Sequence, residues 1–269
     1  MNDEERYLFD LMGFLVVDDV LSSAELQELN TIVDRYDIWN TSVPNDDRRR
    51  PKGLSASASG NKVSGSNLHA WPEPARRLIN HPKMMPYLLE LIGPKFRYDH
   101  GYPIFMKKGG EKLQLHGGST PYLQGYYYHC QNGEIDNGLT VVSYALSDVG
   151  PGEGGFAAVP GSHKSNFPCP VQYKEFEKSG PWLIQVPQKA GSAVIFTEAL
   201  THGTWPWVGD SERRSLLYKY SPGYMSWDRN YPAASEVPEA ETDPVLRRIL
   251  EPPYRGRRSA VVEGTNRDS

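Results

Sequence analysis

The chain has 269 residues, a formal net charge of −4 and 38% apolar side chains. This negative charge argues against a nucleic-acid-binding surface, because phosphate backbones attract an excess of Lys and Arg. No segment approaches the roughly 20 apolar residues that cross a bilayer, and residues 1–13 lack the positive charge of a secretory signal. Cys130 and Cys169 are too few for a disulfide scaffold and fit a reduced compartment. The composition predicts a cytoplasmic, single-domain protein.

The N-terminal third predicts a short strand followed by helices. Residues 13–21 (GFLVVDDVL) precede Ser22 and Glu25, which have the spacing of a helix-starting capping box. An apolar stripe then recurs at helical spacing, at Leu26, Leu29, Ile32 and Val33. A second helix is expected over residues 74–92, broken by its internal prolines. Residues 40–68 are rich in Ser, Asn, Gly and Arg, which indicates a long irregular loop that is a lid, a binding loop or disordered.

From Lys95 onward, short segments rich in Val, Ile, Tyr and Phe alternate with Gly and Pro, which predicts strands. The segments are 95–106, 139–146, 154–160, 182–187, 192–196 and 215–222. Because strands do not alternate with helices here, a β-sandwich or β-barrel is favoured over a doubly wound sheet. We therefore expect a helical layer with a lid loop over 1–94, a β core over 95–225 and an extension over 226–269. Within the extension, residues 243–250 (DPVLRRIL) predict a short helix.

Among the seven histidines, His202 has the most informative surroundings. It closely follows the strand SAVIF, and Arg213 begins the next strand eleven residues later. A histidine at the mouth of a barrel can bind a metal, and a neighbouring guanidinium can hold a carboxylate through two parallel hydrogen bonds. Thr204, two residues after His202, can donate its hydroxyl to that carboxylate. This pattern predicts a metal site beside a site for a dicarboxylate cosubstrate.

Residues 138–168 (GLTVVSYALSDVGPGEGGFAAVPGSHKSNFP) resemble the central signature of the phytanoyl-CoA dioxygenase family. The resemblance continues through residues 202–207 (HGTWPW) and Arg213, and it spans about 95–225. The segment GFLVVDDVLSSAEL also resembles the first strand and helix of that family. The resemblance implies a mainly β, double-stranded β-helix (a cupin-like jelly roll) with N-terminal helices packed on it, and it implies iron(II), 2-oxoglutarate and molecular oxygen.

The family's metal site consists of a His-x-Asp or His-x-Glu pair and a distal histidine, a face that leaves three metal positions open. The resemblance places the distal ligand at His202 and gives His163 a structural role. For the first histidine we prefer His116, because Gln114 shares its strand face and corresponds to a 2-oxoglutarate contact in related enzymes. His129, which lies among tyrosines, is the competing candidate.

Neither candidate histidine is followed by the expected carboxylate. Gly118 occupies that place after His116, as in the aliphatic halogenases that resemble this family, where the open position binds chloride. The first hypothesis is therefore a halogenase with chloride as co-substrate. The second is a hydroxylase or related oxygenase that takes its carboxylate from elsewhere, from Glu198, Asp136 or Glu134. The third is a non-catalytic barrel that binds a small molecule.

The expected substrate is a small specialised metabolite, and anionic character is suggested by basic residues within the loop 45–68. These residues are Arg48, Arg49, Arg50, Lys52 and Lys62. The pocket of this fold is the open mouth of the barrel, so His100, Tyr102 and Trp205 are candidates for its walls. A nucleotide or an amino-acid derivative fits this expectation.

Overall fold

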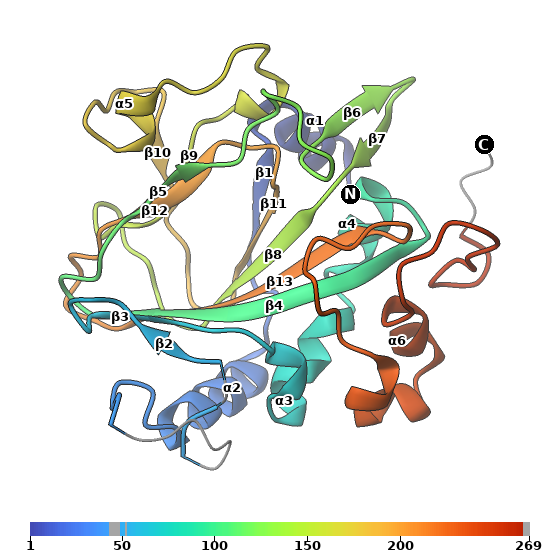
Figure 1. Ribbon diagram of the computed structural model, residues 1–269, viewed down its shortest axis with the longest axis horizontal. Coiled ribbons are helices and arrows are strands. Elements are labelled where there is room, and N and C mark those ends of the chain that lie inside the picture. Colours follow the sequence, from blue (N-terminus) through green and yellow to red (C-terminus); the bar gives the residue numbers. More distant parts are fainter. Residues whose placement is uncertain (43–48, 52, 266–269) are drawn as a thin grey trace.

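Two antiparallel sheets face each other in the computed structural model, which describes residues 1–42, 49–51 and 53–265 (Figure 1). The large sheet has the order β1-β11-β8-β13-β4-β3-β2 and the small sheet the order β10-β9-β12-β5. The strands of the large sheet are β1 (Phe14–Val17), β2 (Ser55–Ala56), β3 (Lys62–Ser64), β4 (Phe96–Met106), β8 (Thr140–Ala145), β11 (Ala193–Thr197) and β13 (Arg213–Pro222). Those of the small sheet are β5 (Leu113–His116), β9 (Gly155–Ala158), β10 (Ile184–Gln185) and β12 (His202–Trp205). A separate hairpin is formed by β6 (Tyr128–Gln131) and β7 (Glu134–Asn137).

Helices cover the side of the large sheet that faces away from the small sheet, where α2, α3 and α6 are seen in Figure 1. The α-helices are α1 (Asp3–Met12), α2 (Ser23–Arg35), α3 (Glu73–Arg76), α4 (Met85–Leu91), α5 (Val171–Lys174) and α6 (Pro244–Ile249). Short 3-10 turns are η1 (Leu68–Ala70), η2 (Arg77–Asn80), η3 (Ser162–Lys164), η4 (Ala234–Glu236) and η5 (Pro238–Glu241). None of the helices in the described part of the chain is long and apolar enough to cross a membrane.

The predicted helix starts and strands are largely confirmed. Ser22 caps α2, and its hydroxyl and the Glu25 carboxylate form the expected reciprocal capping box. The helix expected over 74–92 is broken into α3, η2 and α4, as its prolines indicate. The expected short C-terminal helix is α6, with Asp243 as its N-cap.

The elements that were not predicted include α1, β2 and β3. The helix α1 was not predicted, although Asn2 and Glu5 form a second capping box at its start. The loop expected over residues 40–68 contains β2 and β3, because β3 pairs with β4 and extends the large sheet. Arg48 and Lys52 of the predicted basic cluster lie outside the described residues.

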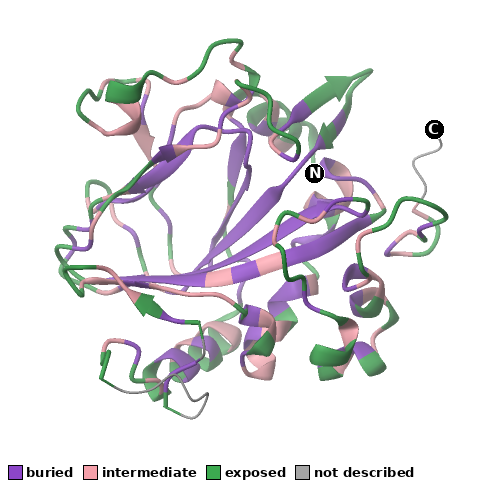
Figure 2. Ribbon diagram, in the orientation of Figure 1, coloured by how far each residue is buried: buried purple, intermediate pink, exposed green. Residues whose placement is uncertain are grey.

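The large sheet separates two apolar clusters. The inner cluster fills the space between the two sheets with buried side chains that include Met106, Phe156 and Phe196. The outer cluster lies between the large sheet and the helices and includes Phe105 and Tyr218. Because successive side chains of a strand point to opposite faces, β4 and β13 contribute alternately to the two clusters. Figure 2 shows these strands buried almost throughout.

Candidate metal and 2-oxoglutarate site

His116 on β5 and His202 on β12 are register partners on neighbouring antiparallel strands of the small sheet. Their ring centroids are 4.3 Å apart. Each ring contacts, through Nδ1, a backbone carbonyl two residues earlier in the chain: Gln114 O at 3.0 Å for His116 and Leu200 O at 2.7 Å for His202. These hydrogen bonds place the proton on Nδ1 and leave both Nε2 atoms as free acceptors, the arrangement found in metal-ligating histidines. The sheet register therefore brings together the two histidines preferred in the sequence.

Glu198 is the acid that accompanies the two histidines. It follows β11 in the turn that carries the chain from the large sheet to β12. Ligand atoms of His116, Glu198 and His202 all lie within 4.8 Å of one another, and Glu198 Oε1 is 4.0 Å from His202 Nε2. Lys219 Nζ donates to Oε1 at 2.5 Å, whereas the buried Oε2 has no hydrogen-bond partner in the described part of the chain. A buried carboxylate that keeps one unpaired oxygen, in one cluster with two acceptor nitrogens, is a donor set that fits a divalent cation.

The electrostatics of the cluster keep Glu198 and His202 in the forms that bind metals. Burial lowers the pKa of His202 to about 3, and repulsion by His116 acts in the same direction, so the imidazole is neutral. For Glu198, burial raises the pKa, but the opposing effect of Lys219 and the two histidines brings it to about 2. Ionised carboxylate and neutral imidazole are the protonation states that metal binding requires.

Arg213 is a buried cation near the same interior. It is 3% exposed, its Nε has no hydrogen-bond partner among the described residues, and Nη1 lies 3.3 Å from the sulfur of Met106. Burial lowers its pKa to about 10, which leaves the guanidinium charged at neutral pH. A Cβ built on Gly155 would lie 3.2 Å from Arg213 Nε. Gly155 precedes Phe156 on β9, and Phe156 is the register partner of Thr204 on β12. Thr204 is buried, whereas Gln114 is exposed.

Gly117 and Gly118 take positive φ angles of 73° and 99°, a region that disfavours side chains. A Cβ on Gly117 would lie 2.5 Å from Leu200 O and 2.6 Å from Glu198 O. The two glycines therefore let the end of β5 approach the turn that carries Glu198. At position 118 the positive φ by itself favours glycine, without reference to a halide.

The other candidate ligands lie on a different part of the molecule. His129 is exposed on the β6–β7 hairpin, where it stacks on Tyr127 with ring centroids 5.2 Å apart. Asp136 pairs with it across the hairpin, and Glu134 is exposed on the same strand. The structure therefore joins His202 to His116 and Glu198, and it does not join it to His129.

The candidate substrate residues are divided between two faces. His100 and Tyr102 lie on the interior face of β4, their rings stacked 6.0 Å apart, and Lys219 Nζ is 5.4 Å from the Tyr102 ring. Trp205 points to the other face of the small sheet, against Phe176. Arg49 is on the surface, in an ion pair with Asp37. His100 and Tyr102 thus lie near Lys219 and the Glu198 carboxylate that it contacts. Trp205 and Arg49 lie elsewhere, on the other face of the small sheet and on the surface.

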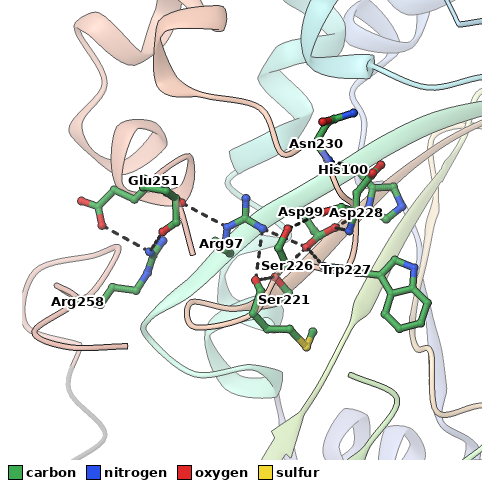
Figure 3. Close-up of polar contacts among 12 residues, drawn as sticks. Arg97, Asp99, His100, Ser221, Ser226, Trp227, Asp228, Asn230, Glu251 and Arg258 are labelled. Atoms are coloured by element: carbon green, nitrogen blue, oxygen red, sulfur yellow. Dashed lines mark hydrogen bonds and ion pairs between the residues drawn. The ribbon is translucent and has the colours of Figure 1, made fainter. Parts of the chain in front are cut away.

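Asp99 fixes the segment beside His100, as Figure 3 shows. This carboxylate is fully buried. It accepts from His100 Nδ1 at 2.7 Å, from the backbone N–H groups of Trp227 and Asp228 at 2.8 and 3.0 Å, and from Arg97 Nη1 at 3.1 Å. The Trp227 ring in turn stacks on Tyr126, at 4.6 Å. The segment that contains Trp227 and Asp228 is therefore held against β4 beside His100.

Three residues of this region were missed in the sequence: Lys219, Tyr126 and Trp227. Burial raises the pKa of Tyr126 to about 12, and the Glu198 charge contributes to the shift. Lys219 lies in the strand segment LLYKY, between two buried tyrosines. This position is the sequence feature that could have indicated a buried functional lysine. A charged residue inside an otherwise apolar strand needs a buried partner, and Glu198 provides it.

Comparison with known proteins identifies a family and a fold. The family described as Phytanoyl-CoA dioxygenase (PhyH) matches residues 9–215. HygX from Streptomyces hygroscopicus, solved with nickel, 2-oxoglutarate and hygromycin B bound, is 24% identical with a TM-score of 0.70 over 85% of this chain and 90% of that chain. AviO1 from Streptomyces viridochromogenes Tue57 is 19% identical, with a TM-score of 0.61 over 80% and 92% of the two chains. The non-heme alpha ketoglutarate dependent carbocyclase SnoK from nogalamycin biosynthesis is 18% identical, with a TM-score of 0.61 over 83% and 85%. No curated protein matches the chain.

These likenesses confirm the predicted mainly β jelly-roll fold. The family match covers most of the chain and includes both sheets up to the start of β13. The protein therefore belongs to the phytanoyl-CoA dioxygenase family of iron(II)- and 2-oxoglutarate-dependent enzymes.

Proposed function

We propose that the protein is an iron(II)- and 2-oxoglutarate-dependent oxygenase that acts on a small specialised metabolite, with His116, His202 and Glu198 as the metal ligands. The observation that carries the proposal is the convergence of two imidazoles and one carboxylate within 4.8 Å. Two histidines and one carboxylate on one face of the metal leave three positions open for cosubstrate and oxygen. When bound, iron would supply the activation of molecular oxygen, with 2-oxoglutarate as the two-electron reductant that is oxidised to succinate and carbon dioxide.

The chain's own side chains bind and orient the reactants. His116 and His202 offer Nε2, and Glu198 offers Oε2, while Lys219 holds the other carboxylate oxygen. The buried guanidinium of Arg213 matches the distal carboxylate of 2-oxoglutarate, because its planar N–H groups can make parallel charge-assisted hydrogen bonds. The family membership supports the same cofactor and cosubstrate.

The substrate is proposed to enter beside His100 and Tyr102. These residues lie near Lys219 and the metal ligands, and Trp227 and Tyr126 form a stacked aromatic wall nearby. The binding of hygromycin B by HygX supports a polar small molecule as substrate. Aromatic faces beside polar groups are typical of sites for such ligands.

Halogenation is the second candidate reaction, and one observation favours it. Glu198 Oε1 is already paired with Lys219, so a site in which Glu198 stays on Lys219 would leave a metal position open to chloride next to Gly118. We place oxygenation first because Oε2 of Glu198 is free and the two glycines have a backbone explanation.

Conversion of 2-oxoglutarate to succinate tests the proposed class. We expect iron(II)-dependent and oxygen-dependent succinate formation by the wild-type protein without added substrate. His202→Ala should abolish it, whereas His129→Ala, the matched control on the β6–β7 hairpin, should not. Equal activity in His202→Ala and the wild-type protein would sink the proposal.

Chloride titration separates oxygenation from halogenation. The visible charge-transfer absorption of the anaerobic iron(II)–2-oxoglutarate complex reports the remaining metal ligands. If Glu198 is a ligand, chloride should leave the wild-type spectrum unchanged and should change that of Glu198→Ala, where a position is opened. A chloride-dependent spectrum in the wild-type protein would favour halogenation.

A further inference from the structure

Lys62, Met106 and Arg213 form a row across the large sheet. Met106 is the register partner of Lys62 on one side and of Arg213 on the other. Directly opposite residues in antiparallel strands project from the same face. Met106 belongs to the apolar cluster between the two sheets, whereas Val63, the neighbour of Lys62, belongs to the outer cluster. Both cationic side chains therefore emerge on the interior face, on either side of Met106.

Neither cation has an anionic partner within the described ranges. Arg213 contacts the sulfur of Met106 and leaves Nε unpaired. Lys62 is half-buried, and its ammonium takes part in no hydrogen bond or ion pair with a described residue. The acid that acts on it from a distance is Glu111, whose carboxylate accepts from the Ser59 N–H at 2.9 Å. Burial lowers the pKa of Lys62, and repulsion by Arg213 adds to the shift.

A buried and a half-buried positive charge that repel each other are unfavourable unless an anion neutralises them. Strands are spaced about 4.8 Å apart, so the two side chains start roughly 10 Å from each other and can converge on one group between them. Their chemistry is complementary, because Arg presents a planar fork and Lys a compact point charge. A carboxylate has two oxygens, one for each cation.

We propose that Lys62 and Arg213 together form a two-cation subsite that binds the distal carboxylate of the cosubstrate, with Lys62 as a positioning residue on β3. This inference rests on the proposed function, since it takes 2-oxoglutarate as the ligand. It assigns a role to a lysine in the segment that the sequence indicated to be a lid loop. The short strands β2 and β3 then serve to bring this charge to the barrel interior.

Calorimetric titration of the manganese(II)-loaded protein tests the subsite without turnover. The probes are 2-oxoglutarate and 2-oxopentanoate, which keeps the five carbons and lacks the distal carboxylate. Lys62→Met should raise the Kd for 2-oxoglutarate at least about ten-fold and should leave the weaker binding of 2-oxopentanoate unchanged. Lys62→Arg should recover most of the affinity. The matched control is Lys108→Met, which removes an exposed lysine paired with Asp210 near the end of β4 and should bind 2-oxoglutarate as the wild-type protein does.

The outcomes are distinguishable. Unchanged affinity of Lys62→Met for 2-oxoglutarate overturns the subsite and leaves the proposed function intact. An equal loss of affinity for both probes shows that Lys62 has a merely structural role, and this result also overturns the subsite. Failure of the wild-type protein to bind 2-oxoglutarate contradicts both proposals. The ligand-free melting temperature is an independent readout, because removing the repelled lysine should raise it in Lys62→Met, and a lower value than wild type counts against the inference.

Discussion

Lys219 donates a 2.5 Å hydrogen bond to Glu198, and both side chains are buried beside His202. The pair joins the middle of the large sheet to the turn that leads into the small sheet. Burial lowers the pKa of Lys219, but the attraction of Glu198 outweighs it and raises the pKa overall. The ion pair thus holds the carboxylate that we propose as a metal ligand, while its Oε2 has no hydrogen-bond partner among the described residues.

Removal of Lys219 should destabilise the metal-free protein strongly. Lys219→Met leaves a buried, uncompensated carboxylate, which costs about 3–5 kcal/mol of unfolding free energy. In the double variant Lys219→Met/Glu198→Gln the loss should be clearly smaller than the sum of the two single losses. Denaturant unfolding measures all three. Additive losses would show that the two side chains are not coupled and would contradict this description of the pair.

Substitution of Gly118 should disturb the backbone more than the metal. Gly118→Ala forces a side chain to φ +99°, with Thr201 Oγ1 3.1 Å from the new Cβ, and we expect a loss of about 1–2 kcal/mol in stability. Gly60→Ala is the control, because Gly60 also has a positive φ but open space around it, so its loss should be smaller. Manganese(II) affinity should stay near wild type in both. A large loss of metal affinity in Gly118→Ala alone would instead place residue 118 at the metal.

Asp99 should control the order of the segment around Trp227. Asp99→Ala removes the acceptor of the Trp227 and Asp228 N–H groups and leaves the buried Arg97 charge unpaired. We expect faster amide hydrogen exchange at these two residues and a loss of about 3–5 kcal/mol in stability. Exchange measured by NMR checks this. Unchanged exchange at both amides would show that other contacts hold the segment.

His163 should contribute to acid sensitivity. Burial is the largest cause that lowers its pKa from 6.5 to about 4, and its Nε2–H donates to Asp10 O at 2.9 Å. Because the unfolded chain takes up the proton first, stability falls as the pH drops from 6.5 to 4 and levels off below 4. The loss amounts to about 3 kcal/mol. Melting temperatures of His163→Gln should fall less over this window, and an equal fall in both proteins would exclude this role.

The sequence predicted the elements whose signals are local. The capping box at Ser22, the prolines between α3 and α4 and the apolar strand segments are each encoded within a few residues. The helix α1 was overlooked because its polar composition hides a capping box, with Phe9 as its single buried residue. The strand β3 was overlooked because three residues gain stability only by pairing with β4.

The candidate site was predictable in part for the same reason. His202, Arg213 and His116 follow from strand spacing and family resemblance, and the structure brings the two histidines together. The place of Glu198 in this cluster depends on how the turn after β11 approaches β5, a contact between segments about 80 residues apart that no local pattern reports. Its partner Lys219 depends on the pairing of β13 with β8 and β4. The sequence alone therefore left the carboxylate open among Glu198, Asp136 and Glu134.

The most direct test of the metal site is a crystal structure with manganese(II) and 2-oxoglutarate bound under anaerobic conditions, with the metal located by its anomalous signal. We expect coordination by Nε2 of His116 and His202, a carboxylate oxygen of Glu198 and the 2-oxo acid. Metal bound elsewhere, or water or chloride beside Gly118 with Glu198 retained by Lys219 alone, would contradict the assignment of Glu198 as the third ligand.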